Sequence, residues 1–253
     1  MVAAALHVGF THIDTANDYN NQRGVGAALD KVKNRSSYFL TTKVPAQISA
    51  RSAYAKTLAD LGDNLDQLGL AFVDLVLVHF PPPGNVLFCA AMQEQWRALE
   101  AFYHAGKARS IGVSNYCESS LDCILSNASV VPAVNQIKYH VGMSADPRGI
   151  KSYCDEKGIV TQAYSPLGDG TTELISGPLV DGIGKAHGKT GAQVSLRWIY
   201  RHGVPLSTKS TSATHLGEDL DALSDSWELT DAEMTTLDGA TSPKGQPSFA
   251  CVR

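Results

Sequence analysis

The sequence predicts an α/β protein with a mostly parallel sheet, of the (β/α)8-barrel class, and three observations carry this prediction. Short apolar stretches alternate with helical patterns along the whole chain, which is typical of repeated βαβ units. Most of the apolar stretches lack the alternation of half-exposed strands, as expected for strands buried on both faces. Polar residues stand at the carboxyl ends of several stretches, where barrel enzymes place their catalytic groups.

The expected elements follow one another in a regular order. Seven stretches are predicted to be strands: 11–14, 38–44, 73–79, 110–114, 133–138, 159–164 and 204–208. Apolar residues at helical spacing predict helices over 22–33, 50–69, 91–105, 117–127, 147–157, 190–202 and 213–223. The helix over 50–69, for example, repeats leucine at positions 58, 61, 65 and 68 and is followed by Gly69. The residues before the first strand are interpreted as the end of a helix.

The chain is expected to form a single domain over residues 1–253. No low-complexity segment or Pro/Gly/Ser-rich linker divides it, and residues 241–253 are interpreted as a C-terminal loop or tail. A doubly wound sheet is the competing parallel architecture, and it usually carries G-x-G-x-x-G after its first strand. The nearest approach, residues 24–29, lacks the third glycine and lies inside a helical pattern, so the barrel is favoured.

Composition and charge exclude several classes of function. A hydrophobic content of 43% is ordinary for a globular protein. The net charge of −4, without any basic block, gives no electrostatic basis for binding nucleic acid. No apolar run approaches the roughly 18 residues that a membrane span needs.

The cysteine pattern predicts free thiols. The five cysteines are scattered and odd in number, without a CxxC pair: Cys89, Cys117, Cys123, Cys154 and Cys251. We expect neither a disulfide framework nor a metal site, and we expect the cytoplasm or another reducing compartment. Organelle targeting stays open if the amino terminus is incomplete.

Four residues at three successive strand ends have the chemistry of a proton-transfer site: Asp14, Tyr19, Lys43 and His79. An ammonium group beside a phenol stabilises the phenolate, and a carboxylate can hold that ammonium in place. A neutral imidazole can hydrogen-bond and orient a substrate carbonyl. Taken one by one the residues have ordinary interpretations, because an Asp–Lys pair is commonly a structural ion pair and a histidine after an apolar run is commonly hydrogen-bonded core.

Seven motifs in register resemble the aldo-keto reductases, which are NAD(P)H-dependent enzymes on a (β/α)8 barrel. They are GFTHIDTANDY (9–19), TK (42–43), LVHFP (77–81), GVSNY (112–116), NQ (135–136), AYSPLG (163–168) and LSTKS (206–210). The resemblance spans nearly the whole chain. It implies hydride transfer from NADPH to a carbonyl substrate, an aldehyde or a ketone.

The resemblance also implies a role for each matched residue. Tyr19 would be the general acid, Lys43 would favour its ionised form, Asp14 would pair with Lys43, and His79 would position the carbonyl. Substrate contacts would come from Tyr19, His79 and Phe80. The implied cofactor contacts are Asp14, Ser114, Asn115 and Gln136 near the nicotinamide carboxamide, Tyr164 stacked on the ring, Ser165 and Leu167 after it, Lys209, Ser210 and His215 at the 2′-phosphate, and Glu218 and Asp219 at the adenine.

Three features depart from the family pattern. The N-terminal hairpin and the first barrel strand have no counterpart here, so the barrel is expected to be incomplete, with seven visible strands. His215 stands where an arginine is expected, which should weaken the preference for NADPH and leave room for NADH. Phe80 replaces the usual tryptophan of the substrate site.

Two classes of function therefore remain open. The intact set of Asp14, Tyr19, Lys43 and His79 favours a carbonyl reductase. The absent first strand favours a catalytically impaired aldo-keto-reductase-like subunit, with a binding or structural role in an assembly whose protein partner covers the open barrel edges. The sequence does not name the substrate, because the loops after the strands determine specificity in barrels.

Overall fold

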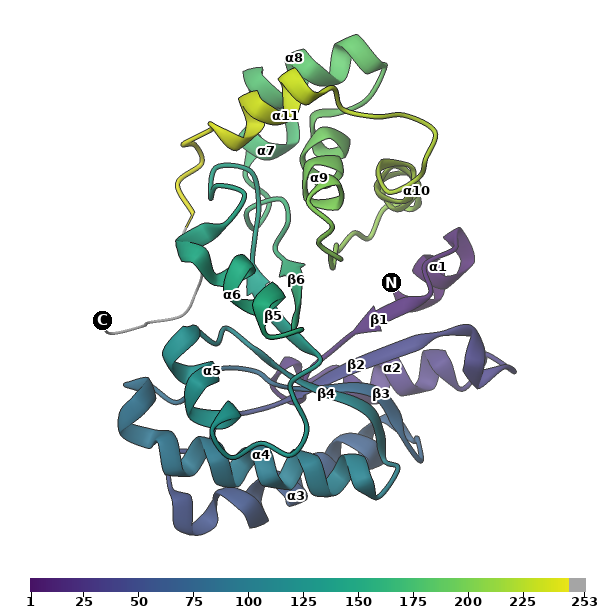
Figure 1. The fold of residues 1–253 in the computed structure, drawn as a ribbon. Coiled ribbons are helices and arrows are strands. Elements are labelled where there is room, and N and C mark those ends of the chain that lie inside the picture. The colour runs from purple at the N-terminus through teal and green to yellow at the C-terminus, as the bar shows by residue number, and fades with distance from the viewer. Residues whose placement is uncertain (246–253) are drawn as a thin grey trace.

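The protein is built on one curled parallel sheet of six strands in the order β1-β2-β3-β4-β5-β6 (Figure 1). The structure is a computed structural model that describes residues 1–245, apart from the side chains of residues 85 and 86. The strands are β1 (His12–Asp14), β2 (Phe39–Val44), β3 (Val73–Val78), β4 (Ala108–Ser114), β5 (Val134–Lys138) and β6 (Val160–Tyr164). Each strand pairs in parallel with the next, so crossover helices connect them.

All seven predicted helices form, within a few residues of their expected ends. The α-helices are α1 (Val2–Val8), α2 (Gln22–Leu29), α3 (Ala50–Leu68), α4 (Cys89–His104), α5 (Glu118–Leu125), α6 (Ile150–Glu156), α7 (Thr172–Ser176), α8 (Pro178–His187), α9 (Gly191–Arg201), α10 (Ala213–Ala222) and α11 (Asp231–Asp238). Helices α7, α8 and α11 were not predicted. Helix α3 ends where expected because Gly69 adopts a left-handed conformation, with φ 67°.

The predicted seventh strand, residues 204–208, shrinks to a single parallel bridge between Leu206 and Ala163 of β6. The amide of Ala163 donates to the Pro205 carbonyl at 2.8 Å, and the amide of Ser207 donates to the Ala163 carbonyl at 2.8 Å. Because Pro205 has no amide hydrogen, it cannot donate a further hydrogen bond to β6, and the pairing stops before it becomes a strand. The prediction was right about the position of this segment and wrong about its extent.

The sheet curls far enough to bring its first and fifth strands together. Gln136 on β5 donates through Nε2 to Oδ2 of Asp14 on β1 at 2.8 Å, although 122 residues separate them. Outside the sheet, α1 packs against α10, so helices from the two ends of the chain also meet. The architecture is that of an incomplete β/α barrel with β1 at one edge of the sheet.

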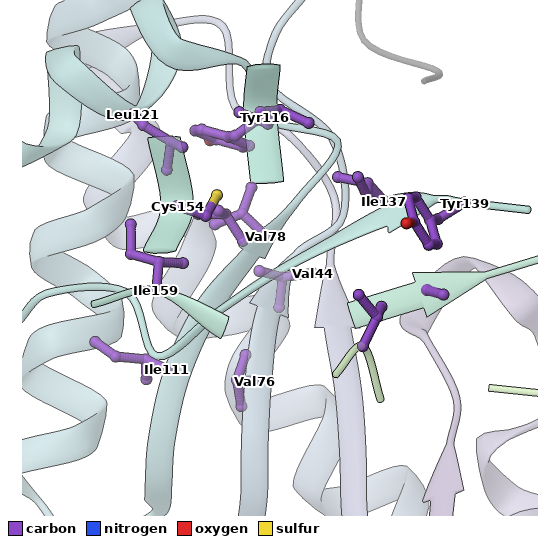
Figure 2. Packing of buried hydrophobic residues seen from close by; sticks show 14 of the residues in the cluster. Val44, Val76, Val78, Ile111, Tyr116, Leu121, Ile137, Tyr139, Cys154 and Ile159 are labelled. Atoms are coloured by element: carbon purple, nitrogen blue, oxygen red, sulfur yellow. The ribbon is translucent and has the colours of Figure 1, made fainter. Parts of the chain in front are cut away.

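The hydrophobic core lies between the sheet and the helices that cover it. Figure 2 shows Val44, Val76, Val78 and Ile111 on neighbouring strands, and Leu121 from α5 belongs to the same buried cluster. In Figure 1, α3 and α4 lie side by side against one face of the sheet. No helix within residues 1–245 has the length and apolar character needed to cross a membrane.

The expectation of five free thiols is wrong. Cys89 at the start of α4 and Cys123 on α5 form a disulfide, with 5.7 Å between their Cα atoms. The two cysteines are 34 residues apart, and the packing of α4 against α5 brings them together. Cys154 is a buried free thiol, and Cys251 lies outside the described residues, as does part of the predicted tail, 246–253.

Candidate active site

Three adjacent strands bring the predicted catalytic residues to one end of the sheet. Asp14 is the last residue of β1, Lys43 is the penultimate residue of β2, and His79 directly follows β3. The register aligns Asp14 with Thr41 and Lys43 with Leu77, so these carboxyl ends lie at the same edge. Tyr19 closes the short 3₁₀ helix η1 (Asn17–Tyr19) that follows β1.

Lys43 is the centre of the site. Its side chain is buried, with 1% of its surface exposed, and its Nζ forms an ion pair with Oδ1 of Asp14. The same Nζ donates to the Thr15 carbonyl at 3.2 Å and lies 3.5 Å from the Tyr19 hydroxyl. Tyr19 is 47% exposed, so the buried cation contacts a phenol that solvent or a substrate can reach.

His79 stands beside the phenol with its ring in a fixed environment. The Tyr19 and His79 ring centroids are 5.5 Å apart in an edge-to-face arrangement, and Phe80 follows at 4.8 Å from His79. The Nδ1 atom of His79 lies 3.0 Å from Oδ1 of Asp18. Asp18 was not among the residues predicted for the site. Burial lowers the pKa of His79 below its ordinary value, while the Asp18 carboxylate opposes that shift.

The residues expected at the nicotinamide form one hydrogen-bonded set around the ends of β4, β5 and β6. The Ser114 hydroxyl donates to the Gln136 carbonyl at 2.8 Å. Asn115 donates through Nδ2 to the His79 carbonyl at 3.0 Å and accepts at Oδ1 from the Tyr164 hydroxyl at 2.8 Å. Asn115 has φ 62°, a left-handed conformation that asparagine tolerates better than most residues. These contacts connect the predicted cofactor residues to the loop that carries His79.

Ser165 and Leu167 lie on the turn that follows β6. The Ser165 hydroxyl donates to Oδ1 of Asp169 at 2.5 Å, and Lys138 at the end of β5 pairs with the other carboxylate oxygen at 2.8 Å. The Lys138 and Ser165 contacts hold the pKa of Asp169 below its ordinary value. Leu167 packs against the core, so this turn is anchored next to Tyr164.

The residues expected to contact the adenosine end of the cofactor lie on a separate segment, after the bridge at Leu206. Ser210 accepts at Oγ from the Ser212 amide at 3.1 Å, and Ser212 caps α10 by accepting from the His215 amide at 3.3 Å. His215 is exposed in the first turn of α10, and Lys209 is exposed just before the helix. Glu218 and Asp219 follow on α10, where the Thr208 hydroxyl donates to Asp219 at 2.8 Å and burial raises the pKa of Asp219.

A buried amide network supports the loop that carries Tyr19, and sequence reasoning missed this network. Asn64 on α3 accepts at Oδ1 from Asn17 of η1 at 2.8 Å and from Gln22 of α2 at 2.7 Å. Its Nδ2 donates to the Lys43 carbonyl at 3.1 Å, and Gln22 accepts from Thr42 at 2.6 Å. One signal was available, because Asn64 stands among leucines on the apolar face of its helix.

Comparisons with known proteins agree with this fold and with the sequence resemblance. The aldo/keto reductase family model matches residues 1–242. Morphine 6-dehydrogenase of Pseudomonas putida is 34% identical over 249 residues, covering 94% of this chain and 80% of the relative. Glyoxal reductase of Bacillus subtilis is 34% identical over 238 residues, covering 94% of this chain and 81% of the relative. The chain therefore belongs to the aldo/keto reductase family, and its relatives include oxidoreductases.

Solved structures give the same result for the fold. MGS-M4, an aldo-keto reductase from a Medee basin deep-sea metagenome library, superposes with a TM-score of 0.87 at 31% identity, covering 100% of this chain and 89% of that one. The aldose reductase of Schistosoma japonicum superposes with a TM-score of 0.80 at 26% identity, covering 95% of this chain and 83% of that one. The predicted barrel class is confirmed.

Proposed function

We propose that this protein reduces an aldehyde or a ketone by hydride transfer from NADPH, with Tyr19 as the general acid. The observation that carries the proposal is the position of the buried Lys43 ammonium, which is paired with Asp14 and lies 3.5 Å from the Tyr19 hydroxyl. A phenol is a weak acid in water, and a nearby cation stabilises the anion that remains after it has given up a proton. The site therefore holds a proton donor whose conjugate base is stabilised by charge.

The proposed proton transfer follows from these contacts. A carbonyl oxygen bound beside Tyr19 gains negative charge as its carbon accepts a hydride, and the Tyr19 proton neutralises that oxygen. The resulting phenolate is stabilised by Lys43, which Asp14 and the Thr15 carbonyl hold in place. His79, 5.5 Å from the Tyr19 ring between centroids, is placed to hydrogen-bond the same oxygen and orient it.

The residues present fit a nicotinamide dinucleotide phosphate. When bound, this cofactor supplies the hydride. Ser114, Asn115 and Gln136 offer polar atoms beside the catalytic group, and Tyr164 offers a half-buried ring at the end of β6. At the other end, Lys209 and the first turn of α10 combine a cation with a helix N-terminus, which favours a phosphate group.

The approach to Tyr19 is partly apolar. The Phe80 side chain is 40% exposed, and its ring lies 4.8 Å from the ring of His79. This ring would contact the part of the substrate that does not react. The names of the relatives, glyoxal reductase and morphine 6-dehydrogenase, indicate that small and large carbonyl or alcohol substrates both occur among similar proteins.

One observation favours the second candidate function, a catalytically impaired subunit of an assembly. β1 forms an edge of the sheet, and its terminal residue Asp14 belongs to the catalytic group. An open edge is a site where another strand can pair. A protein partner at this edge would either complete the site or leave this chain with a structural role alone.

Substitution of Tyr19 by phenylalanine tests the proposed function. The change keeps the ring and removes the proton, so we expect kcat for aldehyde reduction to fall by about 10²–10⁴-fold while NADPH binding stays within about threefold. Steady-state NADPH oxidation and fluorescence titration measure the two effects. An unchanged rate would refute the role of Tyr19, and an inactive parent protein would favour the subunit.

A further inference from the structure

One ring nitrogen of His79, Nδ1, contacts a carboxylate. Asp18 directly precedes Tyr19 on η1, and its Oδ1 lies 3.0 Å from Nδ1 of His79. The His79 side chain is 11% exposed and the Asp18 side chain 54%, so the pair lies at the margin of the site. The backbone carbonyl of His79 also accepts from Asn115, which fixes the position of this loop.

An ionised carboxylate only accepts hydrogen bonds, so Nδ1 of His79 must carry the hydrogen in this contact. In a neutral imidazole one nitrogen donates and the other accepts. With its proton on Nδ1, the neutral ring therefore leaves Nε2 as an acceptor. An acceptor can receive the hydroxyl of an alcohol, but it cannot donate to the lone pairs of a carbonyl oxygen.

The charged groups around His79 come from three elements. Asp18 and Tyr19 face it from η1, Asp14 from β1 and Lys43 from β2. Burial is the largest influence and lowers the pKa of His79, as Lys43 also does, whereas Asp18 and Asp14 raise it. The ring is consequently neutral at neutral pH and gains its second proton at lower pH.

We propose that Asp18 holds His79 in the tautomer with its proton on Nδ1, so that His79 donates to a carbonyl oxygen only after taking up a second proton. Asp18 is thus a positioning residue that acts through His79, and it couples carbonyl binding to proton uptake. The inference rests on the proposed function, because it assumes that the bound oxygen is that of a carbonyl. Alcohol binding, in contrast, would use the neutral ring.

The kinetic test compares the parent protein with Asp18→Asn, using 4-nitrobenzaldehyde, which does not ionise. In the variant the amide can turn its NH₂ toward Nδ1, and the neutral ring can then carry its proton on Nε2. We expect kcat/KM of the parent to rise by up to about tenfold per pH unit as pH falls from about 8 to 6.5. In the variant, kcat/KM should no longer show this rise. Asp181→Asn on α8 removes a carboxylate paired with Lys185 and should keep the parental profile.

A spectroscopic readout does not depend on turnover. In ¹⁵N-labelled parent protein at about pH 8, we expect the Nε2 resonance of His79 at the position of an unprotonated ring nitrogen. Asp18→Asn should move it to the position of a protonated nitrogen, and loss of the signal in His79→Gln gives the assignment. A protonated Nε2 in the neutral parent, or identical pH profiles for parent and variant, would overturn the proposal.

The two readouts separate this inference from the proposed function. If the parent reduces no aldehyde while the resonance shifts as expected, the proposed reaction fails and the role of Asp18 in fixing the tautomer stands. If the parent is active and the resonance does not shift, the role of Asp18 fails and the proposed reaction stands.

Discussion

At the scale of single residues, His215 is the side chain that the family resemblance ties most directly to cofactor choice. It is exposed in the first turn of α10, close to Lys209 and Ser210, where the family resemblance places an arginine. Arginine is always charged and binds phosphate through a two-pronged contact, whereas histidine is charged only at lower pH. The proposed role of His215 at the 2′-phosphate is therefore tested by substitution.

We expect NADPH to bind more tightly than NADH, because Lys209 and the first turn of α10 favour a phosphate group. His215→Arg should raise NADPH affinity by about one to two decades, as a charge-assisted phosphate contact implies. Fluorescence titration with both cofactors measures the two effects.

NADH provides the control for this substitution, because it lacks the 2′-phosphate and its affinity should not change with His215→Arg. An NADPH affinity that stays the same in His215→Arg would show that this position does not contact the phosphate. Binding of neither cofactor would point instead to the non-catalytic subunit.

At the scale of elements, Asn64 links four segments by side-chain hydrogen bonds: η1, α2, α3 and β2. Asn64→Leu has a similar size but leaves the Asn17 and Gln22 amides and the Lys43 carbonyl without this partner. Unsatisfied buried groups cost about 1–3 kcal/mol each, so we expect the free energy of unfolding to fall by about 2–4 kcal/mol. Urea denaturation measures this loss, and kcat should fall as well because η1 carries Tyr19.

Gln67→Leu is a matched control on the same helix. The Gln67 side chain contacts the exposed Asp63, so the change should alter the free energy of unfolding by less than about 0.5 kcal/mol. If Asn64→Leu were as stable as this control, the amide network would not hold the loop that carries Tyr19.

At the scale of the whole molecule, buried histidines make stability depend on pH. Burial lowers the pKa of His79 and of His140 from the ordinary value of 6.5, so the unfolded chain binds their protons more readily. The stability that the two neutral histidines contribute is fully present above pH 6.5. It is lost as pH falls through their lower pKa values in the folded state. Asp60 and Asp219, whose pKa values burial raises, act in the opposite sense.

His140→Asn isolates one part of this dependence. The asparagine amide can replace Nδ1 of His140, which lies 2.7 Å from the Val141 carbonyl, without adding a group that titrates. Between about pH 7.5 and 5.5 the variant should lose less of its free energy of unfolding than the parent does. Parallel pH dependences in urea denaturation would show that His140 gains its proton equally in both states.

The sequence by itself determined the local elements and the types of residue at the strand ends. Apolar runs and helical spacing located the six strands and seven of the helices because these patterns depend on near neighbours in the chain. They also placed Asp14, Lys43 and His79 at one edge, since parallel strands share the direction of their carboxyl ends.

The tertiary structure alone decided the contacts between distant residues. The hydrogen bond from Gln136 to Asp14 depends on the curl of the sheet, and the Cys89–Cys123 disulfide depends on how α4 packs against α5. The Asp18–His79 contact joins residues 61 positions apart, and no local pattern encodes such a distance. Local periodicity specifies which face of an element is buried, whereas the partner of a polar side chain is determined only when the elements have packed together.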